Sequence, residues 1–285
     1  MTAQTTPNSE QIEYWNNQAA KRWLEMQAQL DQIVRPFGEA AMQAAGITDG
    51  LRVLDIGCGC GDTTLALATQ VGLAGQVTGA DISRSMLQRG RDQAQQSGIT
   101  QVAFKEADAQ THPFPKSHYH RVYSRFGVMF FDDPSAAFSN LYSCLLPGGI
   151  ISFICWQPPT ENPWLMTPLQ AANQHLPPPE PPPAGAPGPF SLADHQHVET
   201  LLKTAGFTGI QQRVITRPIT LGRDAAEATH FAVTVGPASN RFKDLPAEQV
   251  SAATAAIEEV MQAHQTEEGV VLSGSARVVV GQRPE

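Results

Sequence analysis

The most constraining feature of this sequence is a short apolar run that ends in closely spaced glycines. Residues 51–56 are typical of a buried strand, Gly57, Gly59 and Gly61 follow at alternate positions, and residues 63–72 have the composition of a helix. Glycine tolerates a positive φ and lets a ligand approach the main chain. A glycine turn between the carboxyl end of a strand and the amino end of a helix is where open α/β sheets bind nucleotides. The segment therefore predicts an adenosine-type cofactor at the edge of such a sheet.

Two acidic residues help to distinguish a phosphate-free adenosyl cofactor from a nicotinamide dinucleotide. Asp81 ends the next predicted strand, residues 76–81, at a separation from the glycine turn that lets a carboxylate reach ribose hydroxyls. A dinucleotide fingerprint has glycine or alanine three places after its second glycine, and Asp62 stands there. Because a carboxylate at the start of a helix would repel a pyrophosphate, the sequence favours an adenosyl cofactor without phosphate over a nicotinamide dinucleotide.

Four motifs, in order, resemble those of class I S-adenosylmethionine-dependent methyltransferases. They are Asp55-x-Gly57-x-Gly59-x-Gly61, Asp81-Ile82-Ser83, Glu106-Ala107-Asp108-Ala109 and Leu146-Pro147-Gly148-Gly149, within residues 51–156. The nearest branch resembles the small-molecule enzymes that include the ubiquinone and menaquinone ring C-methyltransferases. The resemblance implies a Rossmann-like methyltransferase fold and S-adenosylmethionine as the cofactor.

The order of the remaining elements predicts an α/β, doubly wound, mostly parallel sheet. Strands and helices alternate along the chain, as in a sheet with crossover helices. We expect a seven-stranded sheet, from strands at 51–56, 76–81, 101–106, 119–124, 149–156, 210–219 and 270–281. The crossover helices are expected at 63–72, 84–97, 134–146 and 193–205.

Helical segments are expected to cover the site from two sides. Apolar residues recur at helical spacing from Glu10 to Leu30, and a further helix is predicted from Ile33 to Ala45. We expect residues 1–48 to form a helical lid over the cofactor, with a helix packed on the edge of the sheet as the alternative. The methyltransferase domain would then span 49–285. Within it, helices are expected at 223–235 and 247–264, and the resemblance suggests that they form a cap insertion over the substrate, residues 223–266.

A proline-rich stretch interrupts the domain. Eight prolines lie between residues 177 and 189, and repeated proline excludes both a helix and a central strand there. We expect residues 157–192 to form an irregular lid loop above the site. An interdomain linker or a proline ligand for another protein is the alternative.

The resemblance also implies roles for single residues. The main chain at Gly57, Cys58 and Gly59 would lie along the methionine part of the cofactor, and Asp55 would lie near its amino group. Asp81 would accept from the ribose hydroxyls, Ile82 would lie against the adenine, and Asp108 would accept from the adenine amine. The predicted cofactor-binding residues are Tyr14, Trp23, Asp55, Gly57, Cys58, Gly59, Asp81, Ile82, Asp108, Ala109 and Ser124.

A general base is not evident in the sequence. The weak catalytic candidates are His230 in the cap, His175 beside the proline-rich stretch, and Arg125, which would either grip an acidic substrate or pair with a nearby carboxylate. Methyl transfer from a sulfonium depends mainly on holding the acceptor in line with the methyl group, so few catalytic residues are expected. The other histidines considered, which we expect to be solvated, are His118, His120, His195 and His197. The candidates for an apolar substrate pocket are Trp156, Trp164, Phe126, Met129 and Phe130, with core packing an equal alternative for the last three.

Composition limits the partners. The formal charge is −8 and the basic residues are scattered, which argues against nucleic acid. The chain has no apolar run of the ~20 residues that span a bilayer and no secretory signal at its start, so a cytoplasmic protein is expected. Cys58, Cys60, Cys144 and Cys155 lack metal-site spacing, and no metal is predicted. A pair at Cys58 and Cys60 that handles a metal or arsenic is the alternative.

These inferences favour an S-adenosylmethionine-dependent methyltransferase that acts on carbon or oxygen of a small, largely apolar metabolite. Two alternatives remain open: a protein that binds S-adenosylmethionine without transferring its methyl group, and a nicotinamide dehydrogenase. The identity of the methyl acceptor and the oligomeric state have no signal in the sequence.

Overall fold

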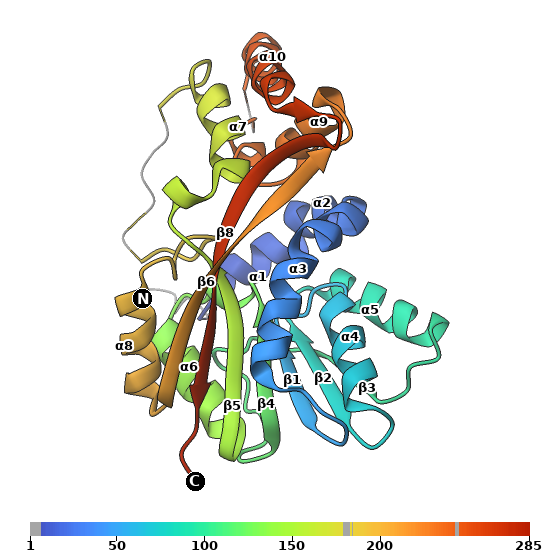
Figure 1. Ribbon diagram of the computed structural model, residues 1–285, viewed down its shortest axis with the longest axis vertical. Coiled ribbons are helices and arrows are strands. Elements are labelled where there is room, and N and C mark those ends of the chain that lie inside the picture. The colour runs from blue at the N-terminus through green and yellow to red at the C-terminus, as the bar shows by residue number, and fades with distance from the viewer. Residues whose placement is uncertain (1–6, 179–182, 184, 243–244) are drawn as a thin grey trace, which may run out of the picture.

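A mixed sheet runs through the protein in the order β3-β2-β1-β4-β5-β8-β6. The computed structural model describes residues 7–178, 183, 185–242 and 245–285 (Figure 1). Strands β1 to β5 are parallel neighbours, whereas β8 runs antiparallel to both β5 and β6. The predicted doubly wound, mostly parallel sheet is confirmed, and a short strand β7 pairs with β8 outside that order. The strands are β1 (Arg52–Ile56), β2 (Gln76–Asp81), β3 (Val102–Glu106), β4 (Tyr119–Arg125), β5 (Leu145–Trp156), β6 (Thr208–Gly222), β7 (Gln265–Thr266) and β8 (Gly269–Gln282).

Helices cover both faces of this sheet. Figure 1 shows α3 (Gln27–Ala45), α4 (Asp62–Val71) and α5 (Arg84–Gln96) in front of the strands, with α6 (Pro134–Cys144) behind. Helix α8 (His195–Ala205) packs against α6. The strand order runs one way from β1 to β3 and the other way from β4 to β5, so right-handed crossovers place the two sets of helices on opposite faces. The reversal between β1 and β4 is where open α/β sheets bind cofactors.

Helix α3 lies unusually close to β4 because Gly38 has no side chain. A Cβ at Gly38 would stand 2.7 Å from the Cδ of Arg125. The hydroxyl of Tyr123 donates to the carbonyl oxygen of Gly38 at 3.0 Å, and the hydroxyl of Ser152 donates to that of Ala41 at 2.8 Å. These buried bonds fix the helix against the middle of the sheet.

The chain before α3 is broken into more helices than expected. The apolar stripe predicted one helix from residue 10 to 30 and another from 33 to 45, but the structure has α1 (Ser9–Asn16), α2 (Gln18–Glu25) and α3. The backbone of Asn17, at φ −110° and ψ −128°, is not helical. The side chain of Asn17 makes no capping hydrogen bond, and its backbone N–H donates to the carbonyl oxygen of Tyr14 at the end of α1.

The long β6–β8 ribbon continues beyond the sheet and carries a group of helices (Figure 1). It holds α9 (Ala225–Thr234), the 3₁₀ turn η3 (Ser239–Phe242) and α10 (Ala247–Ala263), in agreement with the predicted helices. Helix α7 (Pro163–Asn173) packs on α9 and α10. The cap therefore contains a helix that the sequence did not predict.

The expectation of an irregular loop throughout residues 157–192 was wrong for the part before the proline cluster. Pro163 occupies the first turn of α7, where a missing N–H costs nothing, and Pro168 is accommodated within the helix. The cluster itself begins after α7, and its residues 179–182 and 184 lie outside the described part of the chain. The loop's first half also contains the 3₁₀ turn η2 (Pro159–Glu161), and a turn and bends at residues 174–176 follow α7.

One boundary in the core also differs. Helix α6 ends at Cys144 and β5 begins at Leu145, four residues before the predicted start of the strand. Leu145 pairs with Tyr119 before a shift in register, so Leu146-Pro147-Gly148-Gly149 lies in an irregular start of β5 instead of ending a helix. No helix in the described ranges combines the length and apolar character needed to cross a membrane.

Candidate functional site

The glycine turn after β1 has one packed side and one open side. Gly57 and Gly59 both have positive φ, 64° and 54°. A Cβ at Gly57 would stand 2.7 Å from the Cα of Gly127, so this glycine allows the turn to pack on the chain after β4. A Cβ at Gly59 would meet only the Sδ of Met86, at 3.9 Å. The main chain at Gly59 is therefore open to a ligand.

Asp81 is held in place by the main chain on both of its carboxylate oxygens. One oxygen accepts the N–H of Gly59 at 2.8 Å, and the other accepts the N–H of Ser83 at 2.8 Å. Burial raises the pKa of Asp81, while these N–H groups oppose the shift. Because each carboxylate oxygen can accept more than one hydrogen bond, the side chain can still receive two ribose hydroxyls.

Asp55, at the end of β1, has one satisfied oxygen and one unsatisfied oxygen. Its Oδ2 accepts from the hydroxyls of Thr63 and Thr64, at 2.6 and 2.7 Å. Its Oδ1 is buried and has no hydrogen-bond partner in the described part of the chain. Burial raises the pKa of Asp55 to about 6. A buried carboxylate oxygen without a donor is costly, so this atom fits an incoming ammonium group such as the amino group of S-adenosylmethionine.

The predicted residues after β3 and β1 make further contacts with the chain itself. Asp108 accepts from the N–H of Gln110 at 3.0 Å and from the side chain of Asn8 at 3.3 Å. Ala109 is buried next to it. The N–H of Cys58 already donates to Ala80, at 3.2 Å. The roles of Asp108, Ala109 and Cys58 toward the cofactor stay predictions.

Helices α1 and α2 lie across the ends of β2 and β3. Asn16 donates to the carbonyl oxygen of Ile82 at 2.8 Å and accepts from the N–H of Arg84 at 3.1 Å. Asn8, just before α1, donates to Asp108 in the loop that follows β3. In α2, Ala20 is buried with Cys60 and Met86 beside the glycine turn. The two helices thus cover the predicted site, and their role as a lid that opens stays a prediction.

Aromatic rings fill the space between these helices and the sheet. The ring of Trp15 meets Phe130 edge-on at 5.2 Å and Trp23 at 5.7 Å. Tyr14, which was expected to touch the cofactor, packs on Trp15 and stays partly exposed. Trp23 is half-buried. These contacts join α1 and α2 to the turn η1 (Val128–Phe130) that follows β4.

Replacing Asn16 by alanine is expected to weaken binding of S-adenosylmethionine about fivefold and to speed its release. The variant loses two hydrogen bonds that hold α1 on the β2–α5 turn, and each such bond contributes about 0.5–1.5 kcal/mol. Stopped-flow fluorescence can follow release because Trp15 and Trp23 lie in this region. Gln95→Ala, at an exposed residue of α5, is the control. Equal release rates from the two variants would show that the hydrogen bonds of Asn16 do not hold the helix closed.

A second aromatic group, formed by Phe126, Trp156 and Trp164, lies at the ends of β4 and β5. Phe126 has a positive φ of 62°, and its ring stacks on Trp156 at 4.0 Å with an angle of 12° between the planes. Trp164 from α7 packs on Trp156 at 5.1 Å. Phe126 and Met129 are buried core residues, whereas Phe130 is only partly buried. The hydroxyl of Ser124 donates to Ile56 at 2.8 Å, so any contact of Ser124 with the cofactor would come from its main chain.

Arg125 forms ion pairs with two carboxylates of the chain. Its guanidinium lies 2.7 Å from Asp31 of α3 and 2.7 Å from Asp62 of α4. Asp62 also pairs with Arg35 at 2.8 Å. Of the two alternatives for Arg125, the structure therefore shows pairing with nearby carboxylates. Asp31 and Arg35 stand four residues apart on one helix, a spacing that predicts a direct ion pair between them, whereas in the structure each forms its ion pair with a residue outside α3.

This network corrects one step of the sequence argument. Asp62 was expected to repel a pyrophosphate at the start of α4. Its charge is instead compensated by Arg35 and Arg125, so repulsion by Asp62 alone is a weak reason to exclude a dinucleotide. The unsatisfied oxygen of Asp55 is a stronger reason, because it favours a cation at the same turn.

The histidine candidates do not approach the glycine turn through any observed contact. His175 and His230 are exposed, and so are His195 and His197, as expected. The expectation for His120 was wrong, because this residue is half-buried and its Nδ1 accepts the N–H of Arg52 at 3.0 Å. Burial and neighbouring arginines lower the pKa of His120. His118, also half-buried, lies with it at the end of β4 away from the glycine turn.

The four cysteines are buried free thiols. Burial raises the pKa of Cys60, Cys144 and Cys155 to about 12, so these thiols are protonated at neutral pH and are poor metal ligands. In the described part of the chain, no group of three or more histidine, cysteine or acidic side chains could hold a metal ion. Nothing there completes a metal site around the pair Cys58 and Cys60.

Comparison with known proteins identifies the core. Residues 53–149 match the family described as "Methyltransferase domain". This match covers 97 of the chain's 285 residues, and it shows that the core of the chain is similar to a methyltransferase domain. Among curated proteins, the ubiquinone/menaquinone biosynthesis C-methyltransferase of Pseudomonas aeruginosa is 33% identical over 164 residues, which are 56% of this chain and 64% of that protein. An uncharacterised protein of Mycobacterium tuberculosis is 36% identical over 126 residues, 44% of each chain.

The structural comparison agrees with the sequence comparison. The YcgJ protein of Bacillus subtilis matches with a TM-score of 0.58 and covers 88% of this chain and 99% of its own, at 16% sequence identity. At that identity, the likeness shows the fold alone. The chain also spans less than two thirds of the length of both curated relatives. The family match covers the glycine turn, Asp81 and Asp108, but excludes α1, α2 and the whole cap.

Proposed function

We propose that this protein transfers the methyl group of S-adenosylmethionine to a carbon or oxygen atom of a small, largely apolar metabolite. The observation that carries the proposal is the buried, unsatisfied Oδ1 of Asp55 beside a glycine turn that is open at Gly59. Asp81 adds a carboxylate whose orientation is fixed by two backbone N–H groups. These groups suit an adenosyl cofactor that carries an amino group and no phosphate.

The chain's own residues would bind the cofactor, orient it and exclude water. S-adenosylmethionine supplies an electrophilic methyl group on a sulfonium. Asp55 and Asp81 would hold the two ends of the cofactor from neighbouring parallel strands. The rings of Trp15 and Phe130 close the region under α1 and α2. A closed, mostly apolar space favours a step in which positive charge is dispersed.

Positioning would supply most of the catalysis. His175 and His230 are exposed, and Arg125 is engaged with Asp31 and Asp62, so none of the three weak candidates stands as a free base in a buried site. Holding an acceptor in line with the methyl group can account for a large part of a rate enhancement without a base. An acceptor that ionises readily by itself fits this arrangement best.

Transfer of labelled methyl from S-adenosylmethionine to components of a metabolite extract is the direct test. We expect labelled product from the wild-type protein. Asp81→Ala should weaken cofactor binding by about 1–3 kcal/mol, because hydrogen bonds from the ribose hydroxyls to a carboxylate are lost. Asp92→Ala, at an exposed acidic residue of α5, is the control and should bind normally. An unchanged dissociation constant for Asp81→Ala would contradict the ribose assignment.

A protein that binds the cofactor without transferring its methyl group is the second candidate function. The absence of a free base among the three candidate residues favours it. Tight binding of S-adenosylhomocysteine together with no transfer from any extract would support this candidate over the enzyme. Calorimetry with NAD in the same protein tests the dehydrogenase, for which we expect no binding.

A further inference from the structure

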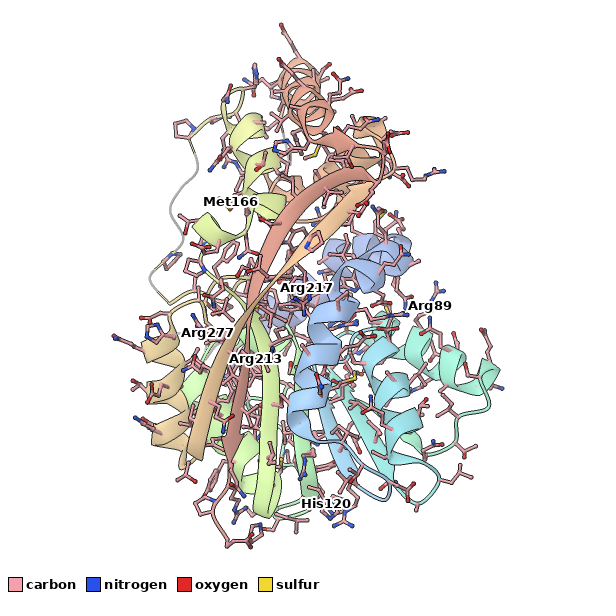
Figure 2. The ribbon with its side chains drawn as sticks, viewed as in Figure 1. Arg89, His120, Met166, Arg213, Arg217 and Arg277 are labelled. Carbon is pink, nitrogen blue, oxygen red and sulfur yellow. The ribbon has the colours of Figure 1, made fainter. Side chains whose placement is uncertain are left out.

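A separate cavity of about 690 Å³ lies on the side of the sheet that faces α8. Gln157 and Pro158, just after β5, form part of its wall, and Ser275 and Arg277 of β8 form another part. The segment that leads into α8 lines it with Phe190 and neighbouring residues, and the cavity is open to solvent. Figure 2 shows Arg277 where β8 passes α8. None of these residues belongs to the predicted cofactor site.

Arg277 brings a buried positive charge to this cavity. Its side chain is 5% exposed. One terminal nitrogen donates to the carbonyl oxygen of Ala193 at 3.0 Å, and the other donates to Oε1 of Gln157 at 3.1 Å. Arg277 has no carboxylate partner within the described ranges. A guanidinium has five N–H donors, so donors remain unused. A buried charge without a counter-charge is costly and calls for an anion.

Gln157 provides an independent sign that a ligand is missing. The side chain is 7% exposed, and its Oε1 is occupied by Arg277. Its Nε2 is buried and has no hydrogen-bond partner among the residues that the structure describes. The side-chain amide and the guanidinium therefore present unused donors side by side. A group that only accepts hydrogen bonds and carries negative charge would satisfy both.

The wall around these donors is rigid. Asn162 is fully buried, and its amide donates to the carbonyl oxygens of Gln157 and Ser275, at 2.9 and 3.1 Å. Its carbonyl oxygen accepts from the N–H of Ser275 at 3.0 Å and from the ring of Trp164 at 3.2 Å. The end of β5 is thus fixed to β8, and the donors of Gln157 and Arg277 need little reorganisation to bind a ligand.

Acidic residues near the cavity do not neutralise Arg277. Asp194 lines the cavity, but its carboxylate caps α8 by accepting the N–H of Gln196 at 2.8 Å, and this bond lowers the pKa of Asp194. Glu161 also lines the cavity from the exposed turn η2 and forms no ion pair with Arg277. His195 follows Asp194 at the start of the helix. The buried donors of Arg277 and Gln157 therefore have no carboxylate partner, because Asp194 caps α8 and Glu161 is exposed.

We propose that this cavity binds the carboxylate of a small organic acid. Arginine recognises a carboxylate with two parallel N–H donors, and Gln157 Nε2 supplies a third. The side chains of Phe190, Val214 and Pro158 offer an apolar surface for the rest of the molecule. The proposal does not depend on methyl transfer, because none of its residues takes part in the proposed cofactor site.

Binding of benzoate, compared with its neutral isostere benzamide, tests the proposal by ligand-observed NMR titration of the full chain. We expect benzoate to bind with a millimolar dissociation constant and benzamide to bind at least tenfold more weakly. Arg277→Met should weaken benzoate binding at least tenfold. Saturating S-adenosylhomocysteine keeps benzoate out of the cofactor site, and benzoate binding should persist in its presence. Equal binding of benzoate and benzamide by the wild-type protein would overturn the proposal.

Two further variants separate the site from general effects of charge or folding. Arg213→Met is the matched control: Arg213 precedes Val214, the partner of Arg277 in the register, so its side chain points to the opposite face of the sheet (Figure 2). It should bind benzoate like the wild type. Gln157→Glu places a carboxylate beside Arg277, so it should raise the melting temperature and weaken benzoate binding at least tenfold. If Gln157→Glu binds benzoate normally, or Arg213→Met loses it as Arg277→Met does, the assignment fails.

Discussion

Replacing Arg125 by methionine is expected to lower the free energy of unfolding by about 3–5 kcal/mol, as is typical when one partner of a buried ion pair is removed. The Arg125 and Asp31 side chains are each 11% exposed, and their charged groups are 2.7 Å apart. The variant would leave Asp31 and Asp62 without their shared counter-charge. Urea unfolding at pH 7.5, followed by circular dichroism, measures the loss.

Arg35→Met is the matched control for this experiment. Arg35 pairs with the same Asp62, but its side chain is 55% exposed, so its removal should cost less than about 1 kcal/mol. Adding Asp31→Asn to Arg125→Met should recover part of the lost stability. Equal losses in Arg35→Met and Arg125→Met, or no recovery in the double variant, would contradict the explanation.

The loss in Arg125→Met should also depend on pH. Burial raises the pKa of Asp31, and attraction to Arg125 opposes that shift. Without Arg125, the pKa of Asp31 in the folded protein rises further, so the folded variant holds a proton that the unfolded chain has released. Stability of the variant is then lost as pH rises through this folded pKa. The deficit relative to wild type should be larger at pH 8 than at pH 5.

Local sequence patterns were enough to predict the glycine turn and the sheet around it. The turn at Gly57 and Gly59 requires residues that are close in the chain, and alternating strands and helices specify a parallel sheet with few alternatives. The strand ends then bring Asp55, Asp81 and Asp108 to one edge of the sheet. Each of these features follows from short segments and general rules of topology.

The features that the sequence did not reveal depend on contacts between distant segments. Arg125 meets Asp31 across 94 residues and Asp62 across 63. Helix α7 is held by α9 and α10, which follow much later in the chain, and the prolines nearby obscured its helical pattern. The donors of Gln157 and Arg277 meet because β5 and β8 are neighbours. No local periodicity encodes such pairings.

Replacing Asp55 by asparagine is expected to weaken binding of S-adenosylmethionine by about 1.5–3 kcal/mol, the range for a hydrogen bond to a charged group. Asparagine can keep the hydrogen bonds from Thr63 and Thr64 through its carbonyl oxygen. It would place an N–H₂ group where the unsatisfied Oδ1 of Asp55 lies, and that group repels an ammonium instead of accepting from it. Calorimetric titration with S-adenosylhomocysteine, which has the same amino group, measures the change.

The same substitution should change the pH dependence of stability. Burial raises the pKa of Asp55 from 3.8 to about 6, so the folded wild-type protein retains a proton that the unfolded chain loses. The wild type therefore loses stability from this group as pH rises from about 4 to about 6, by roughly 3 kcal/mol. Asparagine does not titrate, so the variant should gain about that much relative to wild type between pH 4 and pH 7.5. Urea unfolding at the two pH values measures this difference.

The pH dependence of cofactor affinity should have the opposite sign to that of stability. An ammonium group binds the ionised form of Asp55, so the wild-type affinity for S-adenosylhomocysteine should fall roughly tenfold between pH 7 and pH 5, beyond any fall seen in Asp55→Asn. If Asp55 served only the structure, its replacement would lower the stability of the protein and leave cofactor binding unchanged. If Asp55 serves the ligand, its ionised form destabilises the folded protein alone but strengthens cofactor binding. An affinity with the same pH dependence in both proteins would remove Asp55 from the cofactor site.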